Sequence, residues 1–331
     1  MINWQITAKN QLTKLNTVEQ LEQDNEVKVK ITRCIITKND IDLYMGNVKT
    51  EYPITPSTIA VGQISETLQE SSYYTKGALV YLAPMLDGDL PEDAIQKGIK
   101  PYDNAGFLKE FTVIPKEYVK VMPKVVSESD ALFLNHISLA LTVVDKLKIN
   151  KGEYVAIIGG NILANIIAQL VTYYKAVPIL LDNNDENLEI ARKTDIYYSI
   201  KCDKTAEKQV DEITGGRKCP KVVFVNDNGI SVDTISKFAS DKAEVAITGI
   251  YGNNQKLNLS LAFTKQLSLM FIRSGYEYIE TSVNLLVQKA VNLKYFKLND
   301  YKFEYAQKHF DNAVKRIEND EEFVEFTMNL L

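Results

Sequence analysis

The sequence predicts a two-domain α/β protein, in which a small β-barrel-like domain is joined to an open parallel sheet with helices on both faces. The chain has 331 residues, and single hydrophobic cores stop growing at roughly 250–300 residues. Short β-rich runs fill the first part of the chain, and strands alternate with helices from about residue 129 to residue 276. Such alternation is typical of a doubly wound parallel sheet.

Composition and charge narrow the class of protein. Hydrophobic residues make up 45% and charged residues 24% of the chain, which is typical of soluble globular proteins. The formal net charge is -5 and no long basic run is present, so we expect no nucleic-acid partner. The N-terminus lacks a charged segment followed by an apolar one, and no apolar stretch approaches the ~18–20 residues of a membrane helix. We therefore expect a cytoplasmic protein without a membrane partner.

Four short β-rich runs, separated by turns that contain Pro or Gly, predict the first domain. These runs lie at residues 27–36, 60–64, 78–82 and 111–114. After Pro123, Ser127 and Asp130 supply an N-cap and an acidic first turn for a helix that runs to about Lys146. This change of pattern places the domain boundary near residue 128.

A βαβ unit of the expected length predicts the second domain. An apolar strand at 153–158 leads through Gly159 into a helix at 162–174, and a second apolar strand follows at 177–181. The end of the chain predicts a helix at 279–291, a strand near 295–298 and a helix at 305–317. We therefore expect a first domain of residues 1–128, completed by 277–331, and a second domain of residues 129–276.

The turn after the first strand of this unit predicts a dinucleotide site. A strand that ends in glycine and opens into a helix presents free N–H groups, at the positive end of the helix dipole, to a pyrophosphate. Of the G-x-G-x-x-G pattern only the first glycine is in place, but Asn161 can adopt the left-handed conformation that the second glycine often supplies. The expected cofactor contacts in this turn are Gly159, Gly160, Asn161, Ile162 and Leu163.

Asp182 ends the second strand of the unit and predicts the choice of cofactor. A carboxylate at this place can accept both ribose hydroxyls of an adenosine, and its charge would repel a 2′-phosphate. We therefore predict NAD(H) rather than NADP(H), with Asn183 beside the ribose. The alternative is that Asp182 is a solvated residue that only starts the turn before Asp185.

With these pieces placed, the chain resembles the medium-chain dehydrogenase/reductase superfamily, and the zinc alcohol dehydrogenases in particular. Residues 106–115 look like the stretch that closes the family's GroES-like domain, and residues 243–252 resemble its strand beside the nicotinamide. Residues 267–276 resemble the strand at the dimer edge of the family's Rossmann-type sheet. The resemblance implies a GroES-like β-barrel domain, a Rossmann-type domain and a homodimer. It adds three further cofactor contacts, Gly249, Ile250 and Tyr251.

The family's zinc ligands are missing from the matching positions. Thr37 stands where a cysteine opens the family's C-G-x-D motif, Thr58 stands in place of the histidine of G-H-E, and Asn135 stands at the third ligand position. Zinc binds thiolate, neutral imidazole or carboxylate, and these three side chains offer none of them. Residues 87–93 replace the loop with four cysteines around a structural zinc and contain no cysteine. We therefore expect a protein without zinc, whose widely spaced Cys34, Cys202 and Cys219 are reduced thiols.

The positions that ring the metal in the family are the expected lining of the substrate pocket. They are Thr37, Asn39, Thr58, Asn135 and His136. Hydrogen-bond donors would have to polarise the substrate in place of the metal. Asn39 stands where the family has the hydroxyl of its proton relay, and His136 is the candidate general acid. The alternative for His136 is a partly buried histidine that bonds to nearby backbone.

The predicted function is a zinc-independent, NAD(H)-dependent oxidoreductase acting by hydride transfer on a small carbonyl, alcohol or activated double bond. The alternative is a catalytically silent NAD(H)-binding sensor or scaffold, because all the metal ligands and the relay hydroxyl are absent. A third possibility, a zinc-free quinone or enoyl reductase, fits less well because such enzymes usually bind NADPH. The apolar run 267–272 at the expected sheet edge predicts a homodimer.

Overall fold

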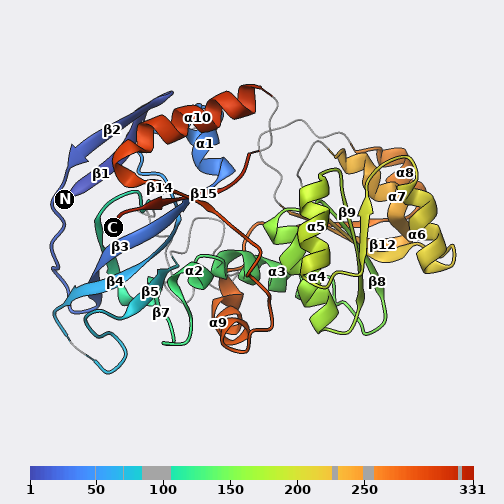
Figure 1. Cartoon of the computed structure of the whole chain (residues 1–331), viewed down its shortest axis with the longest axis horizontal. Coiled ribbons are helices and arrows are strands. Elements are labelled where there is room, and N and C mark those ends of the chain that lie inside the picture. Colours follow the sequence, from blue (N-terminus) through green and yellow to red (C-terminus); the bar gives the residue numbers. More distant parts are fainter. Residues whose placement is uncertain (49, 70, 84–105, 226–229, 249–256, 320–322) are drawn as a thin grey trace. The chain divides into compact units, whose positions relative to one another are not determined.

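The computed structural model describes the chain in two compact units (Figure 1). The first unit comprises Met1–Phe133 with Leu298–Leu331, and the second comprises Leu134–Lys297. Residues 277–297, which the sequence pattern placed with the first domain, cluster with the second unit. The described residues are 1–48, 50–69, 71–83, 106–225, 230–248, 257–319 and 323–331.

The first unit is built on a seven-stranded sheet of order β14-β15-β3-β4-β5-β7, with β6 also paired to β3. The strands of this sheet are β3 (Glu26–Ile36), β4 (Ile59–Thr67), β5 (Leu79–Leu82), β6 (Phe111–Pro115), β7 (Val119–Val121), β14 (Asn299–Lys302) and β15 (Phe326–Asn329). A separate two-stranded sheet consists of β1 (Ile2–Ala8) and β2 (Gln11–Asn16). The helices of the first unit are α1 (Lys38–Tyr44), η1 (Lys116–Tyr118), α2 (Glu128–Ala131), η4 (Phe303–Tyr305) and α10 (Ala306–Glu318). The long strand β3 is central, because it pairs with β4, β6 and β15.

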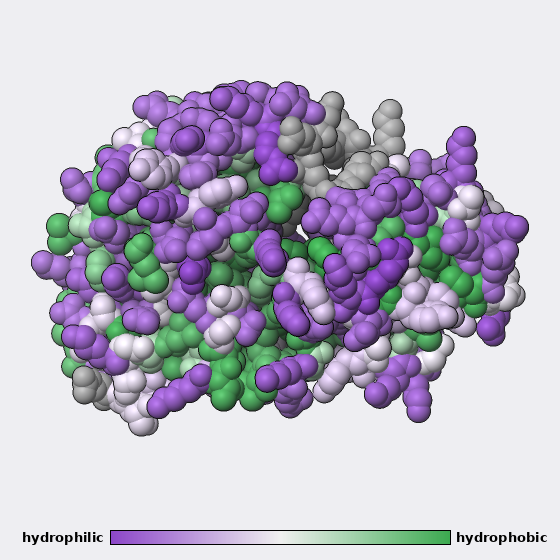
Figure 2. All heavy atoms as spheres, viewed as in Figure 1, coloured by the Kyte–Doolittle hydropathy of each residue, from purple (hydrophilic) through white to green (hydrophobic). Residues whose placement is uncertain are grey.

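Alternating side chains explain why β3 holds this position. Val27, Val29 and Ile31 are fully buried and are separated by lysines, as expected for β-branched residues on the inner face of a half-buried strand. On the helical side, α10 turns Phe310 inward against Tyr44 of α1, with the ring centroids 5.3 Å apart. Figure 2 shows hydrophilic side chains, in purple, over the outer face of α10. Phe310 also lies against Phe326 of β15, with the ring centroids 6.4 Å apart, so helix and sheet share one apolar core.

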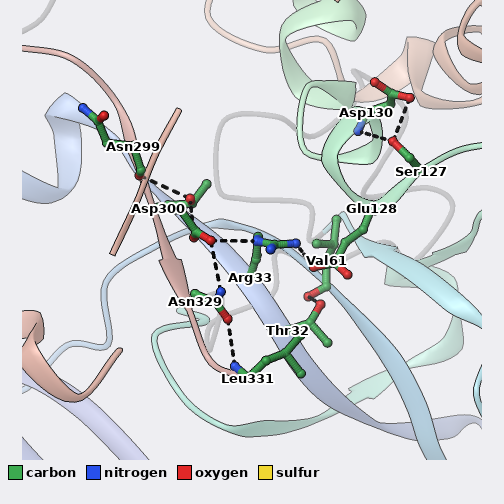
Figure 3. A network of polar contacts seen from close by, with 11 residues as sticks. Thr32, Arg33, Val61, Ser127, Glu128, Asp130, Asn299, Asp300, Asn329 and Leu331 are labelled. Atoms are coloured by element: carbon green, nitrogen blue, oxygen red, sulfur yellow. Dashed lines mark hydrogen bonds and ion pairs between the residues drawn. The ribbon is translucent and has the colours of Figure 1, made fainter. Parts of the chain in front are cut away.

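Arg33 ties the C-terminal strands to the rest of the first unit (Figure 3). Its guanidinium lies 2.7 Å from Glu128 of α2 and 3.4 Å from Asp300 of β14. Asp300 also accepts hydrogen bonds from Thr327 and Asn329 of β15. The last strands of the chain are therefore attached to β3 by polar side chains as well as by the sheet.

The second unit is a six-stranded, wholly parallel sheet of order β10-β9-β8-β11-β12-β13. Its strands are β8 (Tyr154–Ile158), β9 (Val177–Asp182), β10 (Tyr198–Lys201), β11 (Cys219–Val225), β12 (Ala239–Thr248) and β13 (Ser268–Phe271). Its helices are α3 (Leu134–Lys146), α4 (Ile162–Tyr173), α5 (Asp185–Lys193), α6 (Ala206–Thr214), η2 (Val232–Thr234), α7 (Ile235–Phe238), α8 (Leu259–Thr264), η3 (Tyr276–Tyr278) and α9 (Ile279–Val287).

Counted along the chain, this strand order is 3-2-1-4-5-6, the arrangement of a Rossmann-type doubly wound sheet. The strands are almost continuously apolar because helices cover both faces: residues 155–158 of β8 and residues 179–181 of β9 are fully buried. The strand order reverses between β8 and β11, and ligands of such sheets bind at the carboxyl ends of the strands at this point. No helix in the described ranges is both long and apolar enough to cross a membrane.

Candidate functional site

The turn between β8 and α4 is built around Gly159. Its φ of +109° lies in the region that favours glycine, and a Cβ at this position would lie 2.3 Å from the carbonyl oxygen of Val225 on β11. The N–H of Gly159 donates to the carbonyl oxygen of Leu181, at 2.8 Å. The first glycine of the predicted motif is therefore required by the close approach of three neighbouring strands.

Asn161 acts as a helix cap and not as a substitute for a left-handed glycine. Its backbone is extended, with φ −62° and ψ −179°, and its side-chain oxygen accepts the N–H of Ala164 at 2.9 Å. The expectation of a left-handed conformation here is wrong, because an Asn before a helix gains more by capping it. The next two N–H groups, of Ile162 and Leu163, donate to no other group in the described ranges and lie at the positive end of α4.

Asp182 is the last residue of β9 and its side chain lies against Gly160. A Cβ at residue 160 would come within 2.7 Å of the Asp182 carboxylate. The residue is 0% exposed, and its Oδ1 accepts the N–H of Asn184 at 2.5 Å. Asp182 thus does start the turn before α5, as the alternative required, but it is not solvated. A ribose could reach this carboxylate only after the groups that cover it have moved.

The next strand carries a cation and a thiol to the same edge of the sheet. Lys201 of β10 lies beside Asp182 in the strand register, and its Nζ contacts both carboxylate oxygens of Asp185 at 2.9 Å. Cys202 donates its backbone N–H to the carbonyl oxygen of Asp182. Burial raises the pKa of the Cys202 thiol, and the charge of Lys237 lowers it.

Asn183 is exposed beside this edge, whereas the expected contacts Gly249, Ile250 and Tyr251 lie outside the described residues.

In the first unit, Thr37 begins α1 and is bound to Asp40. The backbone N–H and the hydroxyl of Thr37 both donate to Oδ2 of Asp40, each at 2.8 Å. The N–H of Ser57, from the segment before β4, donates to Oδ1 of the same carboxylate at 2.6 Å. Asp40 is only 2% exposed. Burial, the largest effect, raises its pKa, while the hydrogen bonds from Thr37 and Ser57 lower it.

This contact changes the role expected for Thr37. A threonine hydroxyl has a single proton, and here that proton is directed at Asp40. The hydroxyl therefore serves the capping box at the start of α1 and does not act as the free donor that the sequence predicted. Sequence reasoning missed Asp40 as a functional candidate, although it is the aspartate of the C-G-x-D pattern.

The remaining expected pocket residues are distributed over both units. Asn39 is exposed on α1, and Thr58 is half-buried just before β4. Asn135 is half-buried and His136 is buried, both in the first turn of α3. The structure thus brings Thr37 together with Asp40 and Ser57 in the first unit. Asn135 and His136 belong to the second unit.

The cysteines show no sign of thiolate chemistry. Burial raises the pKa of Cys34 and of Cys219 to about 12, which keeps both thiols protonated at neutral pH. Across the described ranges, no group of three His, Cys, Asp or Glu side chains is placed to hold a metal ion.

Comparison with known proteins identifies the first domain. Residues 23–124 match the family model of the alcohol dehydrogenase GroES-like domain. The match covers less than a third of the chain, and solved alcohol dehydrogenase structures share the fold of the whole chain. The predicted fold class, a Rossmann-type parallel sheet plus a GroES-like domain, is confirmed.

The relatives that the chain resembles in sequence are distant. A sorbitol dehydrogenase from Halalkalibacterium halodurans is 23% identical over 301 residues, covering 84% of this chain and 85% of the relative. An uncharacterized zinc-type alcohol dehydrogenase-like protein from Haemophilus influenzae is 26% identical, over 51% of this chain and only 49% of its own length. The solved structure of a protein described as a short chain alcohol dehydrogenase from E. coli CFT073, in complex with NADH, superposes with a TM-score of 0.82 at 18% identity. That match covers 100% of this chain and 99% of the solved one.

Proposed function

We infer that the chain is a zinc-independent, NAD(H)-dependent oxidoreductase that transfers hydride to or from a small carbonyl, alcohol or activated double bond. The observation that carries this proposal is the β8–α4 turn, where Gly159, two N–H groups of α4 and the carboxylate of Asp182 lie together at the switch point of a Rossmann-type sheet. The relatives that share most of the chain's length supply the reaction class, since they include a sorbitol dehydrogenase.

The residues of the turn fit a dinucleotide. The N–H groups of Ile162 and Leu163 would hold its pyrophosphate, and Asp182 would accept the adenosine ribose hydroxyls in exchange for the N–H of Asn184. When bound, a nicotinamide supplies or takes the hydride. The protein's own part is to bind both reactants, to exclude water and to move the proton that accompanies the hydride.

Two charges favour NAD(H) over NADP(H). A 2′-phosphate would approach the carboxylate of Asp182, which repels it. Lys201, a nearby cation on the next strand, is already bound by Asp185 through two contacts of 2.9 Å. A phosphate would therefore meet one negative charge without a free positive charge from Lys201 to offset it.

Zinc independence rests on the chemistry of three side chains. By resemblance, Thr37, Thr58 and Asn135 stand at the positions of the catalytic zinc ligands of the zinc alcohol dehydrogenases, and they carry only hydroxyl or amide groups. The hydroxyl of Thr37 is also engaged by Asp40. We predict that the purified protein contains well under one zinc per chain by elemental analysis and that its Tm is unchanged in chelator. One zinc per chain would contradict this prediction.

The experiment that tests the function combines binding and turnover. Calorimetry should show that NADH binds, and absorbance at the reduced nicotinamide band should show NAD-linked oxidation or reduction within a panel of polyols such as sorbitol, simple ketones and enones. Tight NADH binding with no turnover on the panel would favour a silent NAD(H)-binding protein. Absence of NADH and NADPH binding would contradict both functions.

A further inference from the structure

The chain passes from the first compact unit to the second and later returns, so it has two crossings. The outward crossing lies between Phe133 and Leu134, and the return crossing lies between Lys297 and Leu298. Helix α2 is the last element before the outward crossing, and strand β14 is the first element after the return crossing. Because hinges are a few residues that absorb changes in backbone angles, bending between the units has to take place at these crossings.

A single arginine of the first unit binds the elements next to both crossings. Arg33 on β3 is 95 residues from Glu128 of α2 and 267 residues from Asp300 of β14 in the sequence. Its Nη1 donates to Oε1 of Glu128 at 2.7 Å, and its Nε donates to Oδ2 of Asp300 at 3.4 Å (Figure 3). Different nitrogens of one rigid, planar guanidinium therefore bind the two carboxylates.

We propose that Arg33 is a conformational clamp that holds α2 and β14 to β3 and thereby restricts bending at both crossings together. The clamp belongs to the fold and does not depend on which reaction the chain performs. Its signature is joint loosening: removal of this one side chain frees two segments that are far apart in the sequence.

The partners of Arg33 are held in place by their own neighbours. Asp300 accepts a hydrogen bond from the hydroxyl of Thr327 at 2.8 Å and one from the amide of Asn329 at 3.0 Å, and both donors lie on β15. The side chains of Arg33 and Glu128 are only 25% and 24% exposed. A partly buried network of three charges, held in this way, contributes more than an isolated surface ion pair.

The return crossing also has an anchor inside the second unit. Gln169 of α4 is buried, its Oε1 accepts the N–H of Asn292 at 2.6 Å, and its Nε2 donates to the carbonyl oxygen of Asn292 at 3.2 Å. Nε2 also donates to Oδ1 of Asn165 at 3.0 Å. The return crossing is therefore held at Asn292 on one side and at Asp300 on the other, and its bend is confined to residues 293–299.

The competing explanation is that Arg33 only adds to the stability of the first unit, as any ion pair of β3 would. Lys28 provides the matched control, because it lies on the same strand and its side chain is also 25% exposed. Its Nζ lies 3.6 Å from Oε2 of Glu66 on β4, a strand that adjoins neither crossing in the sequence. Lys28→Gln thus removes the same charge from β3 and leaves the contacts to α2 and β14 in place.

The first test measures amide hydrogen exchange in the full-length wild type, Arg33→Gln and Lys28→Gln. Residues 128–133 and 298–302 of Arg33→Gln should both exchange roughly three- to tenfold faster, because partly buried charged hydrogen bonds are lost. Strands β4 and β8 should exchange as in the wild type, and Lys28→Gln should leave both crossing segments unchanged. No change in Arg33→Gln, faster exchange of only one segment, or an equal increase throughout the first unit would overturn the clamp.

A second variant keeps the test valid if Arg33→Gln does not fold. The double variant Glu128→Gln/Asp300→Asn retains the arginine and removes the charge of both its partners. It should speed exchange in the same two segments by a similar factor. If both segments exchange as in the wild type, the clamp is wrong.

The last test measures movement between the units directly. Spin labels are attached at Val18→Cys, a position 82% exposed in the first unit, and at Tyr197→Cys, a position 87% exposed in the second unit. Cys202→Ser removes the partly exposed native thiol. Double electron–electron resonance should give a broader distribution of label distances after Arg33→Gln than in the labelled parent protein or after Lys28→Gln. A distribution of unchanged width would overturn the proposal.

Discussion

Asp182 and Asp40 are almost completely buried, and each accepts a hydrogen bond from a backbone N–H group. A carboxylate removed from water is costly unless such donors replace its hydration. Asp182 has the N–H of Asn184, and Asp40 has those of Thr37 and Ser57. Because a donor left without its acceptor also costs free energy, replacing either carboxylate should lower the local stability of the chain.

The first residue-scale prediction concerns Asp182→Ala. The variant should bind NADH roughly ten- to a hundredfold more weakly, since a hydrogen bond to a charged group is worth about 1.5–3 kcal/mol. The affinity for NADPH should fall less, so the gap between the cofactors should narrow. Isothermal titration calorimetry measures both affinities, and Glu189→Ala, which removes an exposed charge from α5, is the control. Equal affinities of the wild type for NADH and NADPH would refute the assigned role.

The second residue-scale prediction concerns the pH dependence of stability. Because the pKa of Asp40 is raised in the folded state above its ordinary value of 3.8, its contribution to the free energy of unfolding is present below that value and is lost as pH rises through the folded pKa. Asp40→Asn cannot ionise. In urea unfolding, the amount by which its free energy of unfolding lies below that of the wild type should therefore shrink from acid to neutral pH. If this difference in the free energy of unfolding instead grows with pH, the folded state favours the carboxylate form of Asp40.

At the scale of elements, the β8–α4 turn allows a sharp test of backbone geometry. Gly159→Ala adds a Cβ 2.3 Å from the carbonyl oxygen of Val225 at a φ of +109°, and should destabilise the second unit by more than the ~1–3 kcal/mol of backbone strain alone. Gly152→Ala is the matched control, because its φ is +82° but no atom lies within 4 Å of the added Cβ. Denaturant unfolding measures the free energy of unfolding of both variants. Equal losses in the two variants would contradict a steric clash between the added Cβ and Val225.

The same elements show how far a sequence can be interpreted. Apolar runs and a glycine between β8 and α4 predicted a Rossmann-type sheet, because periodicity and turn chemistry are local properties. The capping role of Asn161 was missed, since an Asn in a turn can either cap a helix or adopt a left-handed conformation. The contact between Asp40 and Ser57 joins residues 17 positions apart, and no local pattern indicates it. The grouping of residues 277–297 with the second unit likewise depends on tertiary packing.

At the scale of the whole molecule, the parallel sheet ends in an apolar edge strand, β13. β13 is the last strand in the order and pairs only with β12 among the described strands. Phe271 on this strand is 75% exposed, and Phe263 on the preceding helix α8 is 85% exposed. An apolar edge strand with unpaired backbone groups invites association unless charges, proline or a covering segment protect it.

We therefore expect a homodimer in which two β13 strands pair edge to edge, since this pairing would satisfy the backbone groups of both edge strands. Light scattering at micromolar concentration should give about twice the chain mass of 37.4 kDa. Met270→Pro removes a backbone donor from the edge and Phe271→Lys places a charge there, so the double variant should be largely monomeric. Val18→Lys, at a position 82% exposed in the first unit, should leave the dimer intact. A wild-type protein that scatters as a single chain would refute the edge pairing, whereas a tetramer that the double variant reduces to smaller species would agree with it.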